Sequence, residues 1–155
     1  MALAVSGCDD DSVSHRLNMD LTGGAPVQRI DIDPTSVAAG IDNTVAIDVV
    51  FEDEEGATGT QAESVVFTQY RIDFRLDDEE APYIAGNIDL EIASGGTAGI
   101  VVRAVAEPQL SWVMERYNGG ELDVLARVHL AGVYNDDDEL ILLTHEFIAT
   151  FADYE

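Results

Sequence analysis

The sequence predicts an all-β fold: an immunoglobulin-like antiparallel β-sandwich of about seven strands with one short helix. Apolar and polar residues alternate with a period of two along several segments, which puts one face of each strand in a core and the other in water. Turn residues, among them Asp33-Pro34, Gly56 and Gly95-Gly96, interrupt this pattern at the spacing typical of a sandwich. The chain of 155 residues, 46% of them hydrophobic, is long enough for one such domain with a core.

The alternation also predicts which residues of each strand face inward. The expected strands cover residues 27–33, 44–52, 66–76, 84–92, 100–106, 122–130 and 141–151. Along 44–52 the odd-numbered residues from Val45 to Phe51 are apolar and are expected to face the core. Along 66–76 the even-numbered residues, from Val66 to Leu76, are expected to do the same.

One segment, residues 108–117, has helical rather than strand spacing. Leu110, Val113, Met114 and Tyr117 recur at intervals of three and four, after Pro108 and before two glycines. A short helix that crosses between the sheets is therefore expected. We expect Trp112 to pack this helix onto the sandwich rather than to bind a ligand.

The last two strands define their own register. A tight turn at Asp136-Asp137 makes paired residue numbers sum to 273, so that Leu130 faces Leu143 and both apolar rows share one face. The same register sets Arg127 opposite Glu146 on the outer face, a favourable cross-strand pair. The alternation and the ion pair therefore predict the same hairpin.

The charge of the chain restricts its partners and its environment. The formal net charge is −24, and all seven basic residues are arginine. Self-repulsion of this size has to be screened by salt or neutralised by bound cations. A high-salt habitat and specific divalent-cation sites are two explanations that the sequence leaves open. Nucleic acid is not expected as a partner, because phosphate contacts need clustered basic residues and these arginines are dispersed.

Two acidic runs fall on connections that an immunoglobulin-like order brings to the same end of the sandwich. The carboxylates concerned are Asp53, Glu54 and Glu55 after the second strand, and Asp136, Asp137 and Asp138 in the last turn. Calcium takes six to eight oxygen ligands, often from carboxylates of neighbouring loops, so these residues are candidate metal ligands. Ordinary solvated turns are the other interpretation. A third run, residues 77–80, is expected at the opposite end.

The N-terminus carries the run Val5-Ser6-Gly7-Cys8 followed by three aspartates. This run resembles the lipobox of bacterial lipoproteins, in which the cysteine is acylated and becomes the first residue of a membrane-anchored chain. The resemblance implies a signal-peptide remnant at 1–7, an acidic tether over 8–25 and a sandwich domain over 26–155. It also implies lipidation of Cys8 and a place in the cell envelope, facing the periplasm or the exterior. Without that anchor, the domain would be secreted.

No reaction is indicated. No serine lies in a G-x-S-x-G turn, and the three histidines are dispersed: His15 in the tether, His129 facing outward opposite Thr144, and His145 in an inward row. We therefore expect no catalytic residues and no cofactor other than calcium. The predicted function is a lipid-anchored binding or assembly module with an envelope or surface protein, or a second copy of itself, as partner. The alternative is a subunit of an extracellular filament, in which residues 17–30 complete a neighbour's sheet.

Overall fold

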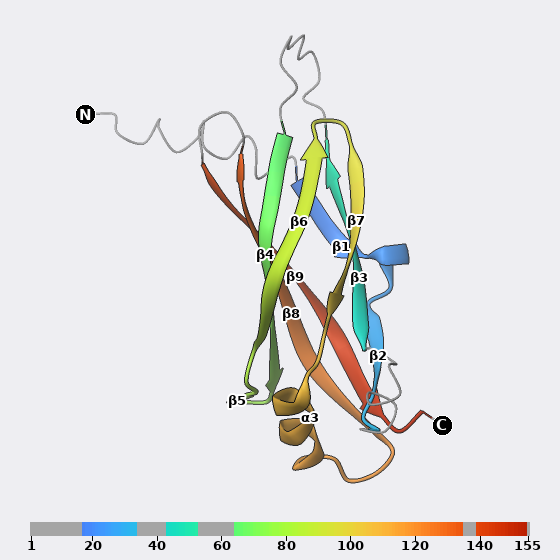
Figure 1. The fold of residues 1–155 in the computed structure, drawn as a ribbon. Coiled ribbons are helices and arrows are strands. Elements are labelled where there is room, and N and C mark those ends of the chain that lie inside the picture. Colours follow the sequence, from blue (N-terminus) through green and yellow to red (C-terminus); the bar gives the residue numbers. More distant parts are fainter. Residues whose placement is uncertain (1–16, 34–42, 53–63, 135–138, 155) are drawn as a thin grey trace, which may run out of the picture.

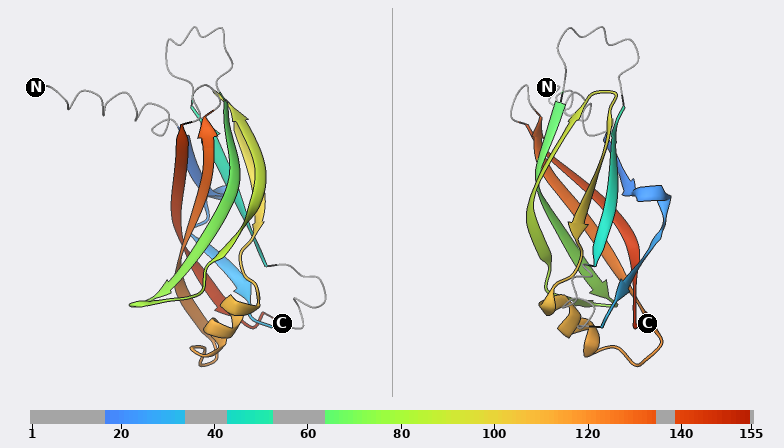
Figure 2. Two further views of the ribbon diagram at one scale, coloured as in Figure 1. Left: turned by 60° about the vertical axis from the view of Figure 1, so that its left-hand side comes forward. Right: turned by 45° about the vertical axis from the view of Figure 1, so that its right-hand side comes forward.

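The computed structural model describes residues 17–33, 43–52, 64–134 and 139–154, which fold into two packed β-sheets (Figures 1 and 2). We call the three-stranded sheet the small sheet and the six-stranded sheet the large sheet. The small sheet has the order β1 (Leu17–Leu21), β3 (Thr44–Phe51), β7 (Thr97–Arg103). The large sheet has the order β2 (Val27–Asp31), β9 (Leu140–Ala152), β8 (Glu121–Tyr134), β4 (Ser64–Leu76), β5 (Glu79–Glu80), and β6 (Ile84–Ala93) also pairs with β4. A 3₁₀ turn, η2 (Thr22–Gly24), follows β1, and the helix α3 (Glu107–Met114) precedes β8.

The all-β sandwich predicted from the sequence is confirmed. The pairing of β3 with β7, and of β9 with β8 and β8 with β4, is the strand order of an immunoglobulin-like sandwich. Two details differ from the expectation. The described residues form nine strands rather than seven, and β2 runs parallel to β9, so the sandwich is not wholly antiparallel.

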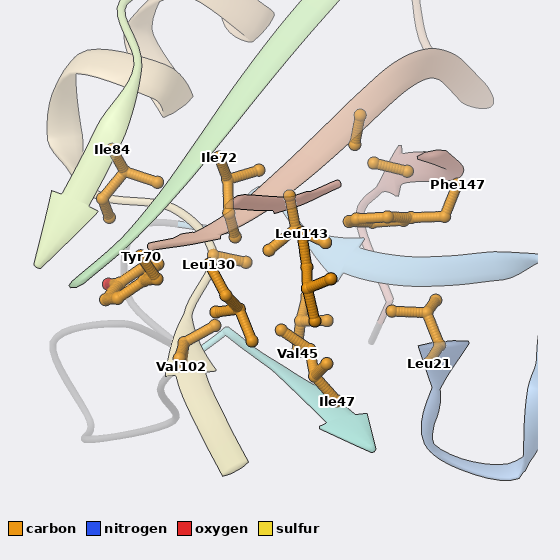
Figure 3. Close-up of a cluster of buried hydrophobic side chains, with 14 of the residues drawn as sticks. Leu21, Val45, Ile47, Tyr70, Ile72, Ile84, Val102, Leu130, Leu143 and Phe147 are labelled. Atoms are coloured by element: carbon orange, nitrogen blue, oxygen red, sulfur yellow. The ribbon is translucent and has the colours of Figure 1, made fainter. Parts of the chain in front are cut away.

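The core lies between the two sheets and is built from the inward rows of their strands (Figure 3). The odd-numbered residues of β3, from Val45 to Phe51, are fully buried as the alternation predicted. The rings of Phe74 and Phe151 meet edge to face, with centroids 5.8 Å apart. The Tyr70 hydroxyl donates a hydrogen bond of 3.0 Å to the Arg103 carbonyl oxygen, which joins the large sheet to the small one.

The predicted β8–β9 hairpin is confirmed residue by residue. Leu130 faces Leu143 in the ladder, and the paired residue numbers sum to 273 from Glu121 to Val133. Arg127 faces Glu146, and its Nε donates to Glu146 Oε1 at 2.9 Å. The predicted turn at Asp136-Asp137 lies outside the described residues.

The predicted inward row of β4 is wrong at its beginning. Val65 and Phe67 are fully buried, whereas Val66 is only partly buried and Thr68 is exposed. The cause is a β-bulge: Phe67 pairs with Gly132 of β8 and Gln69 with Ala131, so Thr68 is an extra residue that shifts the alternation by one. From Tyr70 onward the predicted phase is correct.

The helix forms one residue earlier than predicted and ends sooner, at Met114. Leu110, Trp112 and Val113 are buried against the sheets, so the packing role of Trp112 is confirmed. Met114, which was expected on the inner face, is exposed, because the buried face of the helix is formed by Gln109, Leu110, Trp112 and Val113 and Met114 lies beyond its edge. Gln109 is buried and fixes the helix, since its amide accepts from the Ala106 N–H and donates to the Pro82 carbonyl.

The expected tether over 8–25 is too long at its C-terminal end, because β1 lies within it. Leu17 and Leu21 are buried in the core, and β1 pairs with β3 over its whole length. Both strands of the segment that we considered as a donor, β1 and β2, pair with strands of their own chain.

Candidate functional site

The residues that the sequence singled out for lipidation and metal binding lie outside the described part of the chain. These residues are Cys8 and the six loop carboxylates Asp53, Glu54, Glu55, Asp136, Asp137 and Asp138. The strands that flank the two acidic connections are described, however. Val65, near the start of β4, pairs with Tyr134, the last residue of β8, so the two connections leave the same end of the sandwich. The acidic run over 77–80, whose last two residues form β5, lies at the opposite end of the sandwich (Figure 1).

A candidate site among the described residues lies on the solvent-facing surface of the large sheet over β4, β6, β8 and β9. We call this surface the outer face. Its half near the β8–β9 connection is apolar. Leu140 and Leu142 are 84% and 64% exposed. They pair with Val133 and Ala131, and Val133 pairs in turn with Val66, so these side chains form one continuous patch across three strands.

The other half of the outer face carries a chain of polar side chains. Arg71 Nε donates to Asp73 Oδ1 at 2.7 Å, and Asp73 Oδ2 lies 2.9 Å from His129 Nε2. The second ring nitrogen of His129 lies 2.9 Å from the Thr144 hydroxyl. This polar chain therefore crosses β4, β8 and β9. Its carboxylate uses one oxygen for a guanidinium and the other for an imidazole.

Arginines also lie on this face. Arg71, Arg75 and Arg127, three of the seven arginines, lie there at about half exposure. Arg71 also stacks on the ring of Tyr83, with its guanidinium carbon 4.0 Å from the ring centroid. Each of the three has a carboxylate partner, namely Asp73, Asp78 and Glu146. These three arginines are therefore balanced by carboxylates, while the exposed Asp89 and Glu91 of β6 add negative charge to the same face.

A hollow of about 790 Å³ joins the apolar half to the polar half. Its lining includes Leu142 and Ala131 on one side and Arg71, Asp73 and His129 on the other. Asn87 of β6 closes it at the edge of the sheet. The hollow can accept apolar side chains of a ligand and at the same time offer hydrogen-bond donors and acceptors to it.

The order of hydroxyl, imidazole and carboxylate in the polar chain is also that of a nucleophilic triad. Here the three groups lie across an open sheet surface, where Thr144 is exposed, and Asp73 is shared with Arg71. The contacts are those of a neutralised hydrogen-bonding surface. The sequence predicted the pairing of His129 with Thr144, but Asp73 and Arg71 were missed. Their diagonal contacts depend on β4 lying beside β8, and the neighbour of a strand cannot be inferred from the periodicity within that strand.

The remaining sequence candidates fall elsewhere. His145 is in an inward row as predicted, half-buried, with Nε2 3.2 Å from Asp20 Oδ1 of β1. Within the described ranges, no group of three or more His, Cys, Asp or Glu side chains is arranged to hold a metal ion. No helix in that part of the chain is long and apolar enough to cross a bilayer.

Comparison with known proteins adds little. No protein-family model matches the chain, and no curated protein matches it. Among solved structures, one from Archaeoglobus fulgidus, described only as a crystal structure of a protein, is similar over 69% of this chain and 83% of that chain. The identity is 10% and the TM-score 0.45. The strand order and the outer face define this chain as an immunoglobulin-like β-sandwich with a partly apolar sheet surface, on which three arginines are paired with carboxylates.

Proposed function

We propose that the protein is a non-enzymatic, lipid-anchored β-sandwich of the cell envelope that binds a partner protein through the outer face. The observation that carries the proposal is the exposure of Leu140 and Leu142, at 84% and 64%, beside the hollow over β4 and β8. Neighbouring apolar side chains exposed on a rigid sheet, next to paired charges, are typical of an interaction surface.

A protein partner fits this surface better than a small charged ligand. The apolar half of the outer face offers hydrophobic burial, which is the main favourable term in protein association. The polar half places arginines, a residue type enriched at interfaces, beside carboxylates that already neutralise them. A partner therefore meets paired charges over β4, β8 and β9, with Asp89 and Glu91 of β6 at the margin, although it approaches a chain of net charge −24.

The anchor is tested by the partitioning of the full-length gene product, expressed in a bacterial host, between detergent and water. Acyl chains contribute about 0.8 kcal/mol per buried methylene, so a protein acylated at Cys8 is expected in the detergent phase. The variant Cys8→Ser should move to the aqueous phase. If the wild-type protein and the variant both remain in water, the lipoprotein part of the proposal is wrong.

The binding face is tested by a photoreactive amino acid placed at position 142 in the native host. A matched control places it at Met114, which is also an exposed apolar residue but lies on α3 at the far end of the domain. We expect one adduct of defined mass from position 142 and none of that mass from position 114. Leu142→Asp should abolish the adduct formed from a photoreactive residue at position 140 without lowering the melting temperature. Adducts that are equal from positions 142 and 114 would contradict the proposal.

A further inference from the structure

A second surface of the molecule has a different character: the free edge of β7. Within the described ranges β7 pairs only with β3, in a regular antiparallel ladder from Thr97 to Arg103 without a register shift. It follows β6 on the side of the sandwich where the chain crosses from the large sheet to the small one (Figures 1 and 2). β7 is therefore an edge strand of the small sheet.

The direction of the backbone groups of β7 follows from the bonds at its two ends. The Gly96 carbonyl accepts from the Phe51 N–H at 2.9 Å, and the Ala104 N–H donates to the Asn43 carbonyl at 2.9 Å. Both of these even-numbered residues thus point their backbone groups at the β3 side of the ladder. Because the direction alternates along a strand, Thr97, Gly99 and Val101 point theirs away from it. The odd-numbered Arg103 agrees, since its carbonyl accepts from Tyr70 of the other sheet.

β7 also lacks the carboxylates that the other edge strands carry, and its only charged residue is Arg103 at its end. Edge strands are normally guarded by charged residues, prolines or bulges against pairing with another chain. The other edge strands each carry carboxylates: Asp20 in β1, Asp31 in β2, Glu79 and Glu80 in β5, and Asp89 and Glu91 in β6. β7 carries none, and the longest stretch of the chain without an acidic residue, Ile92 to Ala106, contains it.

The side chains at this edge remain partly uncovered. Val101, on the outer surface, is 64% exposed. Ile100 and Ala98 face the core but are only partly buried, because no other strand of the described residues lies beyond them. A further strand added here would cover all three. The carboxylate nearest to Gly99 belongs to Asp48, and it already accepts a hydrogen bond of 3.0 Å from the Thr22 hydroxyl.

We propose that β7 pairs antiparallel with β7 of a second copy of this chain, which joins two small sheets into one continuous sheet. A second copy fits because two chains of charge −24 can approach closely only where carboxylates are absent from both surfaces. A two-fold axis at Ile100 pairs Gly99 with Val101 of the second copy, and Thr97 with Arg103. In this register the outward-pointing backbone groups of both strands meet, and each Val101 side chain lies over the space left by a glycine.

The pairing is tested with the full chain carrying Cys8→Ser, which removes the only cysteine and the anchor. Ile100→Cys in this background places two thiols across the axis, where opposed residues of an antiparallel pair have the Cα separation that a disulfide needs. A matched control is Asn87→Cys on β6, another edge strand. We expect a disulfide-linked dimer from Ile100→Cys under mild oxidation and none from Asn87→Cys. Equal cross-linking of the two variants would overturn the proposal.

Sedimentation velocity measures the association itself. The Cys8→Ser chain should form dimers in a concentration-dependent manner, with association strengthened by added salt because screening weakens the repulsion of the two chains. Val101→Asp and Val101→Pro should each weaken dimerisation at least about tenfold. The Val101 N–H points away from β3, so proline there is expected to leave the β3–β7 ladder intact. Val50→Asp, which adds the same charge to the outer surface of β3, should have less than about a twofold effect. A chain that stays monomeric at every concentration and salt level, or equal losses at positions 101 and 50, would show that β7 does not pair.

Discussion

The two sheets of this sandwich differ in how they limit the electrostatic repulsion that a chain of net charge −24 exerts on an approaching macromolecule. The large sheet presents side chains, and carboxylates on its outer face are paired with arginines, as in Asp73 with Arg71 and Glu146 with Arg127. The small sheet presents backbone groups, and its edge at β7 is made neutral by omission of carboxylates. In a chain of net charge −24, both are places where another macromolecule can approach.

The difference indicates different kinds of partner. A surface of paired charges and exposed leucines can discriminate between partners by the position of each side chain. A backbone edge discriminates little by side chain and suits a strand that repeats its own pattern, such as a second copy. The two surfaces lie on different sheets, so one chain can use both at once.

Adding a methyl group to a glycine of each sheet should give the largest contrast in stability. At Gly132 of β8 a Cβ would overlap the Val66 carbonyl oxygen and lie 2.8 Å from Phe67 Cα, because the bulge brings β4 close to this residue. At Gly99 of β7 it would lie 3.0 Å from Asp48 Oδ1, the end of a side chain that can move, and 3.7 Å from the Ile47 carbonyl oxygen, which is an ordinary contact. Gly132→Ala should therefore lower the free energy of unfolding by about 3 kcal/mol, and Gly99→Ala should change it by less than about 1 kcal/mol. Urea denaturation measures both, and similar losses would mean that β7 is as constrained as the centre of the large sheet.

Calcium should have the next largest effect, if the acidic connections bind it, because one ion would then tie the two sheets together at their common end. The β3–β4 connection links the small sheet to the large one, and it leaves the sandwich beside the β8–β9 connection. A ligand that binds only the folded state adds about 2.7 kcal/mol at a hundred times its dissociation constant. We expect millimolar calcium to raise the melting temperature more than sodium chloride of equal ionic strength does.

Variants separate a calcium site from diffuse charge neutralisation. Asp53→Asn and Asp137→Asn should each reduce the calcium shift, whereas Asp78→Asn, at the opposite end, should not. Equal reductions would indicate neutralisation of the whole acidic surface. A rise with sodium chloride alone would favour the high-salt explanation of the composition, and no response to either salt would leave the connections as solvated turns.

A structural feature could be predicted when the residues that determine it lie close together in the sequence. The β8–β9 hairpin was predicted in register because two strict alternations and one ion pair, Arg127 with Glu146, agree within one contiguous stretch, residues 122–151. The bulge at Thr68 was missed because Val65, Val66 and Phe67 are all apolar, so the alternation has no phase there. β1 was assigned to the tether and considered only as a strand for a neighbour's sheet, because the alternation of Leu17, Met19 and Leu21 does not tell which chain's sheet it joins.

The functional surfaces were harder to predict than the strands. Each residue of the polar chain could be placed on an outer face, but the contact of Asp73 with His129 needs β4 beside β8. The parallel pairing of β2 with β9 and the free edge of β7 likewise depend on which strands become neighbours. Strand order arises from the packing of the whole domain, and local periodicity contains no record of it.

The link between the two sheets can be weakened selectively at Tyr70. Its hydroxyl donates to the Arg103 carbonyl of β7, and Tyr70→Phe should lower the free energy of unfolding by about 1 kcal/mol. Burial raises the pKa of the Tyr70 hydroxyl, although the nearby Arg103 partly offsets this. The folded state therefore holds the proton more tightly than the unfolded state does.

The sign of the pH dependence follows. The contribution of Tyr70 to stability is fully present below the pKa of an unfolded tyrosine, about 10, and is lost as the pH rises through the higher pKa of the folded state. Tyr70→Phe should flatten the alkaline loss of stability in urea denaturation. The control is Tyr154→Phe. Burial also raises the pKa of Tyr154, but its hydroxyl donates to the Thr150 carbonyl within the large sheet. This variant should therefore keep the part of the alkaline loss of stability that comes from Tyr70. An unchanged alkaline loss in Tyr70→Phe would mean that this bond does not couple the two sheets.

The smallest effect on the free energy of unfolding is expected from the Arg127–Glu146 ion pair of the outer face. Arg127 and Glu146 are each about half exposed, and exposed cross-strand pairs contribute a few tenths of a kcal/mol. A double-mutant cycle with Arg127→Ala and Glu146→Ala should therefore give a coupling energy below about 1 kcal/mol that decreases as salt is added. A coupling energy above about 2 kcal/mol would mean that the pair stabilises the large sheet. A small coupling energy would mean that the pair contributes little to folding, which is the result expected if Arg127 serves mainly to balance Glu146 on the surface that we propose for partner binding.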